Sequence, residues 1–115
     1  DAYNANPTSM AAALDNLSSV VTEKKVVMLG DMLELGEDSL KLHSEVVERL
    51  SAMDLSLVCL VGGEFSKVCQ GNETVHCFAT SDELAKWLAD NPVDGATVLI
   101  KGSRGTRMEK VIPAL

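Results

Sequence analysis

The feature that most constrains the fold is an apolar run that stops at glycine, and it occurs twice. Residues 25–30 read Lys-Val-Val-Met-Leu-Gly, and residues 57–62 read Leu-Val-Cys-Leu-Val-Gly. A strand with one face in water alternates apolar and polar side chains, whereas a strand buried on both faces is a continuous apolar run. The two runs therefore predict strands of a sheet that is covered on both faces.

Helical patterns separate these strands. Apolar residues recur at helical spacing over 8–21 and 38–53, and Asn6-Pro7 supplies a preferred N-cap and first-turn residue for the first helix. The remaining predicted elements are a short helix over 64–70, a strand over 74–78, a helix capped by Ser81, a strand over 96–100 and a final helix through about Ile112. This alternation predicts an α/β, Rossmann-like fold with a mostly parallel sheet and helices on both faces.

Length and composition fit one soluble domain. The 115 residues, of which 46% are hydrophobic, suffice for a single core. No apolar stretch approaches the roughly 20 residues of a membrane-spanning helix. The N-terminus has neither a secretion signal nor a starting Met, so we expect an excised piece of a cytoplasmic protein. Three cysteines without a CxxC pair argue against a disulfide framework and a zinc site, and predict a reducing compartment.

The charge distribution points to a small anion as a ligand. Seventeen acidic and ten basic residues give a net charge of −7, which disfavours a nucleic-acid partner. Residues 101–110 nevertheless contain four cations and one acid, Glu109. A carboxylate or phosphate is therefore expected near this stretch.

Three loops follow predicted strands and carry candidate binding residues, because ligands of such folds bind beyond the carboxyl ends of the strands. Lys101-Gly102-Ser103-Arg104 combines an open backbone, helix N-terminal amides and two cations, which suits an anion; alternatively, Ser103 only caps the last helix. Asp31 and Glu34 follow the first strand, where they hold a substrate ammonium group, orient a metal-bound water or are exposed turn acids. His43 lies on the apolar stripe of its helix, which favours a structural role over a ligand contact.

Taken together, three blocks resemble the C-terminal domain of the Mur ligases. They are Asp1-Ala2-Tyr3-Asn4-Ala5-Asn6-Pro7 with Ser9-Met10, Leu29-Gly30-Asp31-Met32-Leu33-Glu34-Leu35-Gly36 with His43, and Ile100-Lys101-Gly102-Ser103-Arg104 with Met108-Glu109. The resemblance implies that residues 1–115 form the single C-terminal domain of a three-domain enzyme whose UDP-sugar domain and central ATPase domain are absent from the chain. It also implies a further strand immediately before Asp1.

The resemblance implies a ligase of bacterial peptidoglycan synthesis in the cytoplasm. ATP, with Mg²⁺, would phosphorylate UDP-N-acetylmuramoyl-tripeptide, and the amine of D-Ala-D-Ala would attack the acyl phosphate. No metal site is expected in this domain, because the P-loop and the magnesium ligands belong to the central domain, and no Walker A motif occurs in the chain. This domain alone is therefore expected to be inactive and to bind no cofactor tightly.

The resemblance also assigns roles to residues of the three blocks. The nucleotide would be contacted by Asp1, Asn4, Asn6 and Pro7. The dipeptide carboxylate would be bound by Lys101, Gly102, Ser103 and Arg104, and its ammonium end would face Asp31, Glu34 and His43.

Two other function classes fit the pattern from the residues alone. One is a stand-alone module that binds a small anion or a nucleotide without catalysis. The other is a receiver-like signalling domain with Asp31 as phosphoacceptor; Lys101 fits that class, but the acidic pair that it needs at the end of an earlier strand is not visible.

Overall fold

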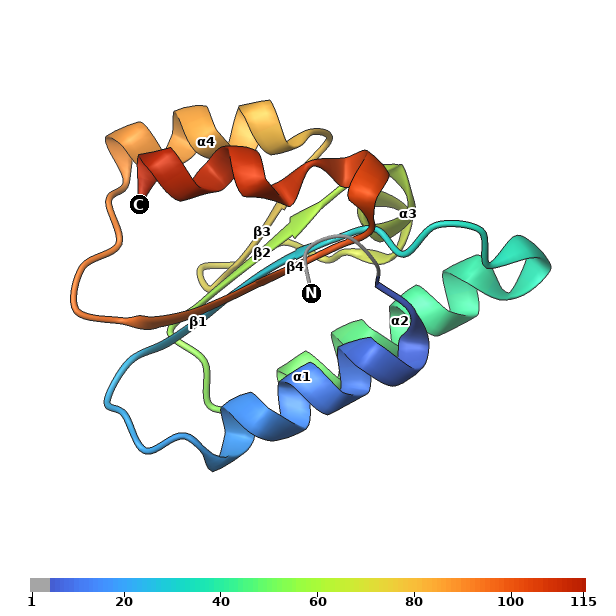
Figure 1. The fold of residues 1–115 in the computed structure, drawn as a ribbon, viewed down its shortest axis with the longest axis horizontal. Helices are drawn as coiled ribbons and strands as arrows, with labels where there is room; N and C mark the ends of the chain where they lie inside the picture. The colour runs from blue at the N-terminus through green and yellow to red at the C-terminus, as the bar shows by residue number, and fades with distance from the viewer. Residues whose placement is uncertain (1–4) are drawn as a thin grey trace.

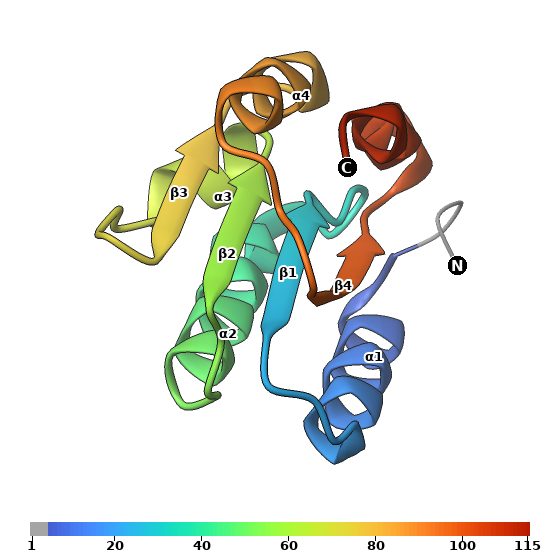
Figure 2. The same ribbon diagram turned by 90° about the vertical axis from the view of Figure 1, so that its left-hand side faces the viewer.

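A four-stranded parallel sheet between two helical layers organises residues 5–115, which are the residues that the computed structural model describes (Figures 1 and 2). The strand order is β3-β2-β1-β4. The elements in chain order are α1 (Pro7–Ser19), β1 (Lys25–Gly30), η1 (Gly36–Asp38), α2 (Ser39–Ser51), β2 (Leu57–Val61), α3 (Gly63–Val68), β3 (Val75–Phe78), α4 (Ser81–Asp90), β4 (Thr97–Lys101), η2 (Arg104–Thr106) and η3 (Met108–Ala114). The predicted fold class is confirmed.

The apolar run of β1 is explained by its central position, because both of its faces are covered. Val27 and Leu29 pack with residues of α1 and α2 on one face, and Val26 and Met28 pack with α4 and η3 on the other. All four side chains are fully buried. Figure 2 shows these two helical layers on opposite sides of the strands. Polar side chains at alternate positions would therefore be buried here, which is why β1 does not alternate.

Local signals fix the start of α1 as predicted. The Asn6 side chain accepts a hydrogen bond from the backbone N–H of Ser9 at 2.8 Å, and the Ser9 hydroxyl oxygen accepts one from Asn6 N–H at 3.1 Å. This capping box satisfies backbone donors that the first helical turn leaves without partners. Pro7 occupies the first turn, where its missing N–H costs nothing.

The start of α4 lies one residue from the prediction. Thr80, and not Ser81, is the N-cap, because the Thr80 hydroxyl accepts a hydrogen bond from Glu83 N–H while the Glu83 carboxylate accepts from the backbone N–H of Thr80. Both residues are good caps, and only Thr80 is followed three residues later by a glutamate. The Ser81 side chain is thereby left for another use.

The prediction of one final helix is wrong. The segment instead forms the two 3₁₀ helices η2 and η3, which are separated by Arg107 in the left-handed region at φ 51°. Ser103 occupies the N-cap position of η2 but its side chain forms no capping hydrogen bond there, and Pro113 lies inside η3, where it donates no backbone hydrogen bond. Arg107 therefore interrupts a regular α-helix near its start, and Pro113 removes one backbone N–H donor near its end.

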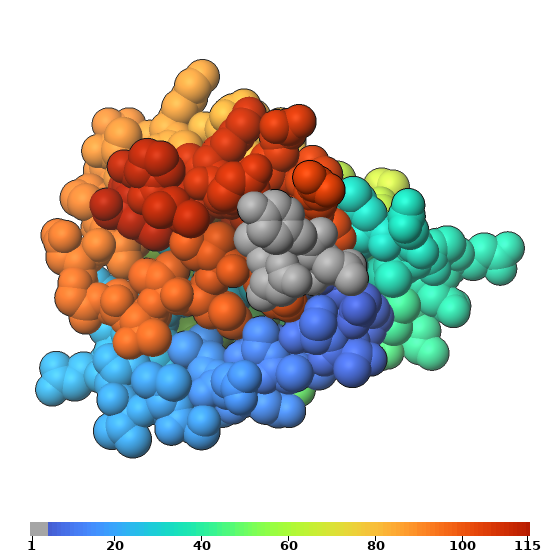
Figure 3. Space-filling view, viewed as in Figure 1, coloured from blue at the N-terminus to red at the C-terminus, as the bar shows by residue number. Residues whose placement is uncertain are grey.

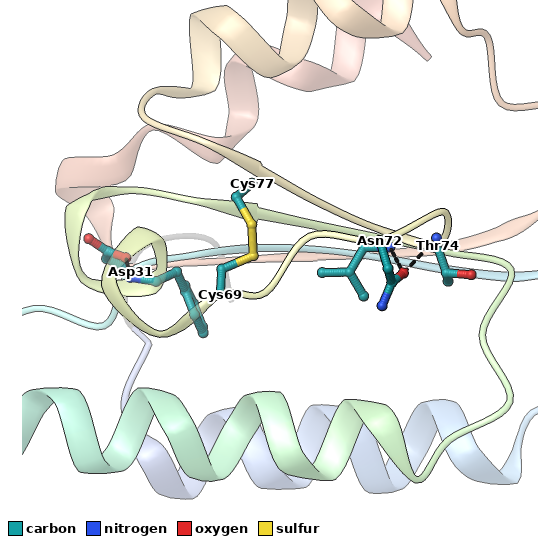
Figure 4. Close-up of a disulfide and its surroundings, with 7 residues drawn as sticks. Asp31, Cys69, Asn72, Thr74 and Cys77 are labelled. Carbon is teal, nitrogen blue, oxygen red and sulfur yellow. Dashed lines mark hydrogen bonds between the residues drawn. A yellow bond between two sulfur atoms is a disulfide. The ribbon is translucent and has the colours of Figure 1, made fainter.

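The expectation of no disulfide is wrong for one pair of cysteines. Cys69, the C-cap of α3, is bonded to Cys77 of β3, with Cα atoms 6.5 Å apart (Figure 4). The chain returns between them through a turn in which the Asn72 side chain accepts hydrogen bonds from the N–H groups of Thr74 and Val75. The sequence contained no CxxC signal because this turn, and not a short spacing, brings the two sulfurs together.

Cys59 is expected to remain unmodified by thiol reagents in the folded protein. It lies in β2, is fully buried, and burial raises the pKa of its thiol to about 12. Only the thiolate reacts, so almost none of the reactive form is present near neutral pH. Incubation of the folded chain with a thiol reagent at pH 8, followed by mass spectrometry, should show no adduct on Cys59. Rapid labelling there would contradict the burial of β2; labelling in denaturant is the positive control.

Two further expectations concern the borders of the described region. β4 is an outer strand of the sheet formed by residues 5–115, and the strand implied before Asp1 lies outside that region, as do Asp1 and Asn4. Within the described residues, no helix is long and apolar enough to cross a membrane.

Candidate functional site

The structure brings the three predicted loops together at the carboxyl ends of the strands. The N–H of Asp31 donates to Val61 O at 3.0 Å, and the N–H of Ser103 donates to Asp31 O at 3.0 Å. The ends of β1, β2 and β4 are thus joined by backbone hydrogen bonds that centre on Asp31. Figure 3 shows that the segment that contains η1, coloured teal, projects from the body of the molecule.

Asp31 is not an exposed turn acid. Only 5% of the residue is exposed, and its two carboxylate oxygens accept hydrogen bonds from the N–H groups of Glu64 and Phe65, each at 2.9 Å. These amides belong to the first turn of α3, which lacks intrahelical partners for them. A carboxylate is also favoured there by the helix dipole. Asp31 therefore performs the capping that Gly62, the N-cap residue itself, has no side chain to perform.

Gly62 is required by this arrangement. Its φ is +118°, a conformation that side chains with a Cβ rarely adopt. A Cβ atom built on Gly62 would also overlap the Asp31 carboxylate. The glycine that ended the second apolar run in the sequence therefore allows the close approach of the Asp31 carboxylate and α3.

His43 lies behind the first loop and is fully buried. Its Nε2 accepts a hydrogen bond from Met32 N–H at 3.0 Å, and its Nδ1 lies 2.7 Å from Ser39 O. This pattern fits an imidazole that carries its proton on Nδ1 and donates it to Ser39 O. His43 Nε2 is also 3.9 Å from Asp31 Oδ1. The ring therefore holds the loop in place from within the protein and has no surface for direct contact with a ligand.

The Lys101–Arg104 block is mostly buried, since only Arg104 is exposed. Ser103 joins two distant segments, because its hydroxyl oxygen accepts a hydrogen bond from Leu33 N–H at 2.8 Å while the hydroxyl donates to Ala5 O at 3.2 Å. Lys101 is 4% exposed.

Gly102 does not leave room for a ligand, as the sequence suggested. A Cβ there would lie 2.7 Å from Thr106 Oγ1 and 2.9 Å from Gly30 Cα. The space is filled by the protein's own η2 segment and the end of β1. The close approach that glycine permits is therefore between parts of the chain.

Two of the predicted dipeptide-binding residues are accessible from solvent: Glu34 and Arg104. Glu34 adopts φ 62° in the loop after β1. Asn6 is exposed and Pro7 half-buried at the start of α1. The buried residues of the predicted set, by contrast, hold in place the loops that carry the exposed side chains.

Next to Asp31, a groove of about 380 Å³ opens between the start of α4 and the η2–η3 segment. Asp31 and Gly62 lie at the ends of the strands that it covers, residues 80–82 form one wall, and residues 105–107 with Lys110 form the other. Arg107 and Lys110 bring positive charge to the groove, and Lys110 Nζ lies 3.4 Å from Asp82 Oδ2. One side of the groove is therefore cationic, and acids lie at its base and opposite wall.

Ser81 is a functional candidate that sequence reasoning missed. It lines the groove beside Asp82, and only 5% of the residue is exposed. A hydroxyl group at the wall of a groove can donate a hydrogen bond to a ligand or accept one from it. The sequence assigned Ser81 to the cap because it cannot show that Thr80 already fills that role.

Glu64 links two elements at the edge of the site. The Ser39 hydroxyl donates to Glu64 Oε1 at 2.6 Å, and Lys67 Nζ lies 3.2 Å from Oε2. The hydrogen bond from Ser39, and after it the one from Lys67, hold the pKa of the Glu64 carboxyl below its usual value. Glu64 is therefore a negative charge beside the start of α3.

Comparison with known proteins shows the family to which the chain belongs. The family model described as "Mur ligase, glutamate ligase domain" matches residues 1–104. The chain belongs to the Mur ligase family. The match includes Asp31 and the Lys101–Arg104 block, and it ends before Arg107 and Lys110.

Several similar proteins of this family are ligases with D-alanyl-D-alanine in their names. The UDP-N-acetylmuramoyl-tripeptide–D-alanyl-D-alanine ligases of Treponema pallidum and Escherichia coli are 39% and 35% identical; both alignments cover 100% of this chain and 26% of the relative. A crystal structure of MurF from Acinetobacter baumannii matches with a TM-score of 0.83 and 33% identity over 98% of this chain and 26% of that one. The MurF ligase of Thermotoga maritima in complex with ADP matches with a TM-score of 0.78 and 30% identity over 99% and 26%. The chain thus spans about a quarter of the length of these Mur ligases.

Proposed function

We propose that this chain is the C-terminal domain of an ATP-dependent ligase that joins D-Ala-D-Ala to UDP-N-acetylmuramoyl-tripeptide in bacterial peptidoglycan synthesis. The observation that carries the proposal is the similarity of the whole chain to ligases of that one name, at up to 39% identity. A cytoplasmic location follows from the need for ATP and a UDP-linked precursor. Mg²⁺ would accompany the ATP in the central domain.

The reaction needs activation of a carboxylate and placement of an amine. A carboxylate is a poor acyl donor, so ATP transfers its γ-phosphoryl group to it and leaves as ADP. The dipeptide amine then attacks the acyl carbon, the amide bond forms, the C–O bond to phosphate breaks, and the amine loses a proton. Holding the amine near the acyl phosphate replaces a bimolecular encounter and supplies much of the rate. This domain's contribution is that placement.

The groove suits a zwitterionic dipeptide. We assign the dipeptide carboxylate to the cationic wall, where Arg107 offers two parallel N–H donors and faces the Ser81 hydroxyl on the opposite wall. Arg104, adjacent in sequence to the groove residue Gly105, supports the carboxylate from the rim. The ammonium group faces the acids of the first loop, Asp31 and Glu34. The loops are held in place from within the protein by buried residues, which are Lys101, Gly102, Ser103 and His43.

The nucleotide is assigned to the start of α1. Asn6 and Pro7 lie there, and we propose that they approach the nucleotide together with Asp1 and Asn4, which lie outside the described residues. Their effect in this chain alone would be weak, since the P-loop belongs to another domain.

The test is an assay of the full-length protein that contains this chain. With ATP, UDP-N-acetylmuramoyl-tripeptide and D-Ala-D-Ala, it should release one phosphate per amide formed, and the product should have the summed mass of both substrates minus one water. L-Ala-L-Ala is the matched control and should be a poor substrate. Turnover with a single amino acid in place of the dipeptide would assign another reaction of the family, and binding without turnover would favour a non-catalytic module.

The isolated chain is expected to release no phosphate from ATP. The groove holds no Walker A loop, so the triphosphate cannot be cradled by this domain alone. The measurement is phosphate release from the pure 115-residue chain, with and without D-Ala-D-Ala, against a buffer control. Release above the control that persists after a second purification would contradict the proposal that ATP chemistry belongs to the central domain.

A further inference from the structure

The Cys69–Cys77 disulfide connects two elements that both lead to the groove. α3 ends at Cys69 and begins directly after Gly62, which lies at the base of the groove. β3 contains Cys77 and is followed by residues 79–82, which line the groove wall. Figure 4 shows the bond between these two elements, with Asp31 at the opposite end of α3. The disulfide therefore lies one short element away from each of two parts of the groove.

Apart from the disulfide, α3 is held by the burial of Phe65 in the core and by the hydrogen bond from Ser39 to Glu64, and these contacts lie in its first half. β3 is an outer strand of the described sheet and pairs there with β2. α3 has six residues, a length at which a helix is not stable by itself. Its first turn is held by Asp31 and its end by the disulfide. Loss of the bond would leave α3 anchored at its first turn and by its packing, and would free β3 from α3.

The bond is accessible to reductants, unlike the third cysteine. Cys77 is exposed and Cys69 is half-buried, whereas Cys59 is fully buried. Disulfides in a reducing compartment are usually transient and redox-sensing rather than structural. Accessibility and the compartment proposed above agree with such a role.

We infer that the Cys69–Cys77 disulfide is a redox-sensitive latch that fixes the groove wall at residues 79–82. A dithiol reductant opens it by exchange: one thiolate attacks Cys77 Sγ, a mixed disulfide forms, and the Cys69 thiolate leaves and takes a proton. The second thiol of the reductant then closes its own disulfide and releases Cys77. Two electrons pass from the dithiol to the cysteine pair. An effect on dipeptide binding and the reducing compartment rest on the proposed function, whereas control of the groove wall by the bond does not.

The test follows the conformation of the isolated chain without any ligase activity. Reduction with dithiothreitol should lower the Tm by roughly 5–10 °C, because a closed loop is released in the unfolded state. It should also raise amide hydrogen exchange at residues 63–69 and 75–82. The fluorescence of Trp87, whose ring centroid lies 5.7 Å from that of Phe78 in β3, should change with the same dithiothreitol dependence.

Variants separate the latch from simple stabilisation. Cys69→Ser with Cys77→Ser should match the reduced protein and show no response to dithiothreitol, while Cys59→Ala should respond like the wild type. A lower Tm with unchanged exchange at residues 79–82 would overturn the latch, since the bond would then stabilise the chain without controlling the wall. An unchanged Tm on reduction, or three free thiols in denaturant after air oxidation, would overturn it as well.

Discussion

Gly62→Ala is expected to destabilise the domain by roughly 3–5 kcal/mol. Strain at a residue held in an unfavourable backbone region costs about 1–3 kcal/mol. Displacing the Asp31 carboxylate would leave the N–H groups of Glu64 and Phe65 without acceptors, at about 1–3 kcal/mol for the buried Phe65 amide and less for the part-buried Glu64 amide. Because domains are stable by only about 5–15 kcal/mol, the loss should be visible as a large fall in the urea midpoint. Equilibrium urea unfolding of the isolated chain measures it.

Gly63→Ala is the matched control. Gly63 is the next residue along, and an added Cβ there would meet no atom within 4 Å. It starts α3, and alanine favours helix over glycine by up to about 1 kcal/mol, so this variant should be as stable as the wild type or slightly more so. Equal urea midpoints for the two alanine variants would mean that Gly62 is not constrained by Asp31.

Arg107→Ala is expected to lower kcat/KM for D-Ala-D-Ala by roughly 30-fold or more in the full-length protein. Removal of one partner from a desolvated charge pair costs about 2–5 kcal/mol. The KM for ATP should change by less than about twofold, because the nucleotide is assigned elsewhere. Arg107→Lys keeps a positive charge and the same backbone demand at φ 51° but loses the paired donors, so it should show an intermediate loss. Steady-state kinetics with varied dipeptide measures these effects, and thermal melting confirms that each variant is folded.

Arg104→Ala tests whether the dipeptide carboxylate binds in the groove or at the Lys101–Arg104 block that the sequence predicted. Support from the rim predicts a smaller loss for Arg104→Ala than for Arg107→Ala. A 30-fold loss with Arg104→Ala alone, and an unaffected Arg107→Ala enzyme, would place the carboxylate outside the groove. Dipeptide kinetics within twofold of the wild type in both variants would show that neither guanidinium holds the substrate.

The core of the fold could be predicted because its signals are local. The apolar run at 25–30 is required by burial on both faces of β1, and the Asn6-Pro7 start of α1 depends on atoms within four residues. The same local rules predicted the wrong structure for the final segment. The left-handed conformation of Arg107 depends on how η2 packs over Gly30 and Gly102. Such packing is not encoded in any short window of sequence.

The site was predictable as a place but not as a set of exposed groups. Strand ends located the loops of Asp31 and Ser103 correctly, because parallel strands bring their carboxyl ends to one edge. Polarity alone could not show that Asp31 caps α3 or that Ser103 bridges Leu33 and Ala5. Ser81 became a candidate only when Thr80 was seen to take the cap. A polar residue near a strand end can bind a ligand or form a hydrogen bond within the fold. Its hydrogen-bond partner within the fold lies far along the chain, so a short stretch of sequence does not reveal it.

The pairing of β1 with β4 has a consequence for the order of synthesis. Val26 is aligned with Leu57 on one side and with Val98 on the other, so the central strand receives its second neighbour about seventy residues after it is made. Contacts of such long sequence separation slow folding, and a nascent chain emerges from the ribosome at about 5–20 residues per second. During those seconds β1 has one open edge, and the loop at Asp31 lacks its hydrogen bond from Ser103. The loop that is proposed to receive the substrate is therefore completed among the last parts of the domain, and a nascent chain that has not yet reached β4 would lack the proposed dipeptide site.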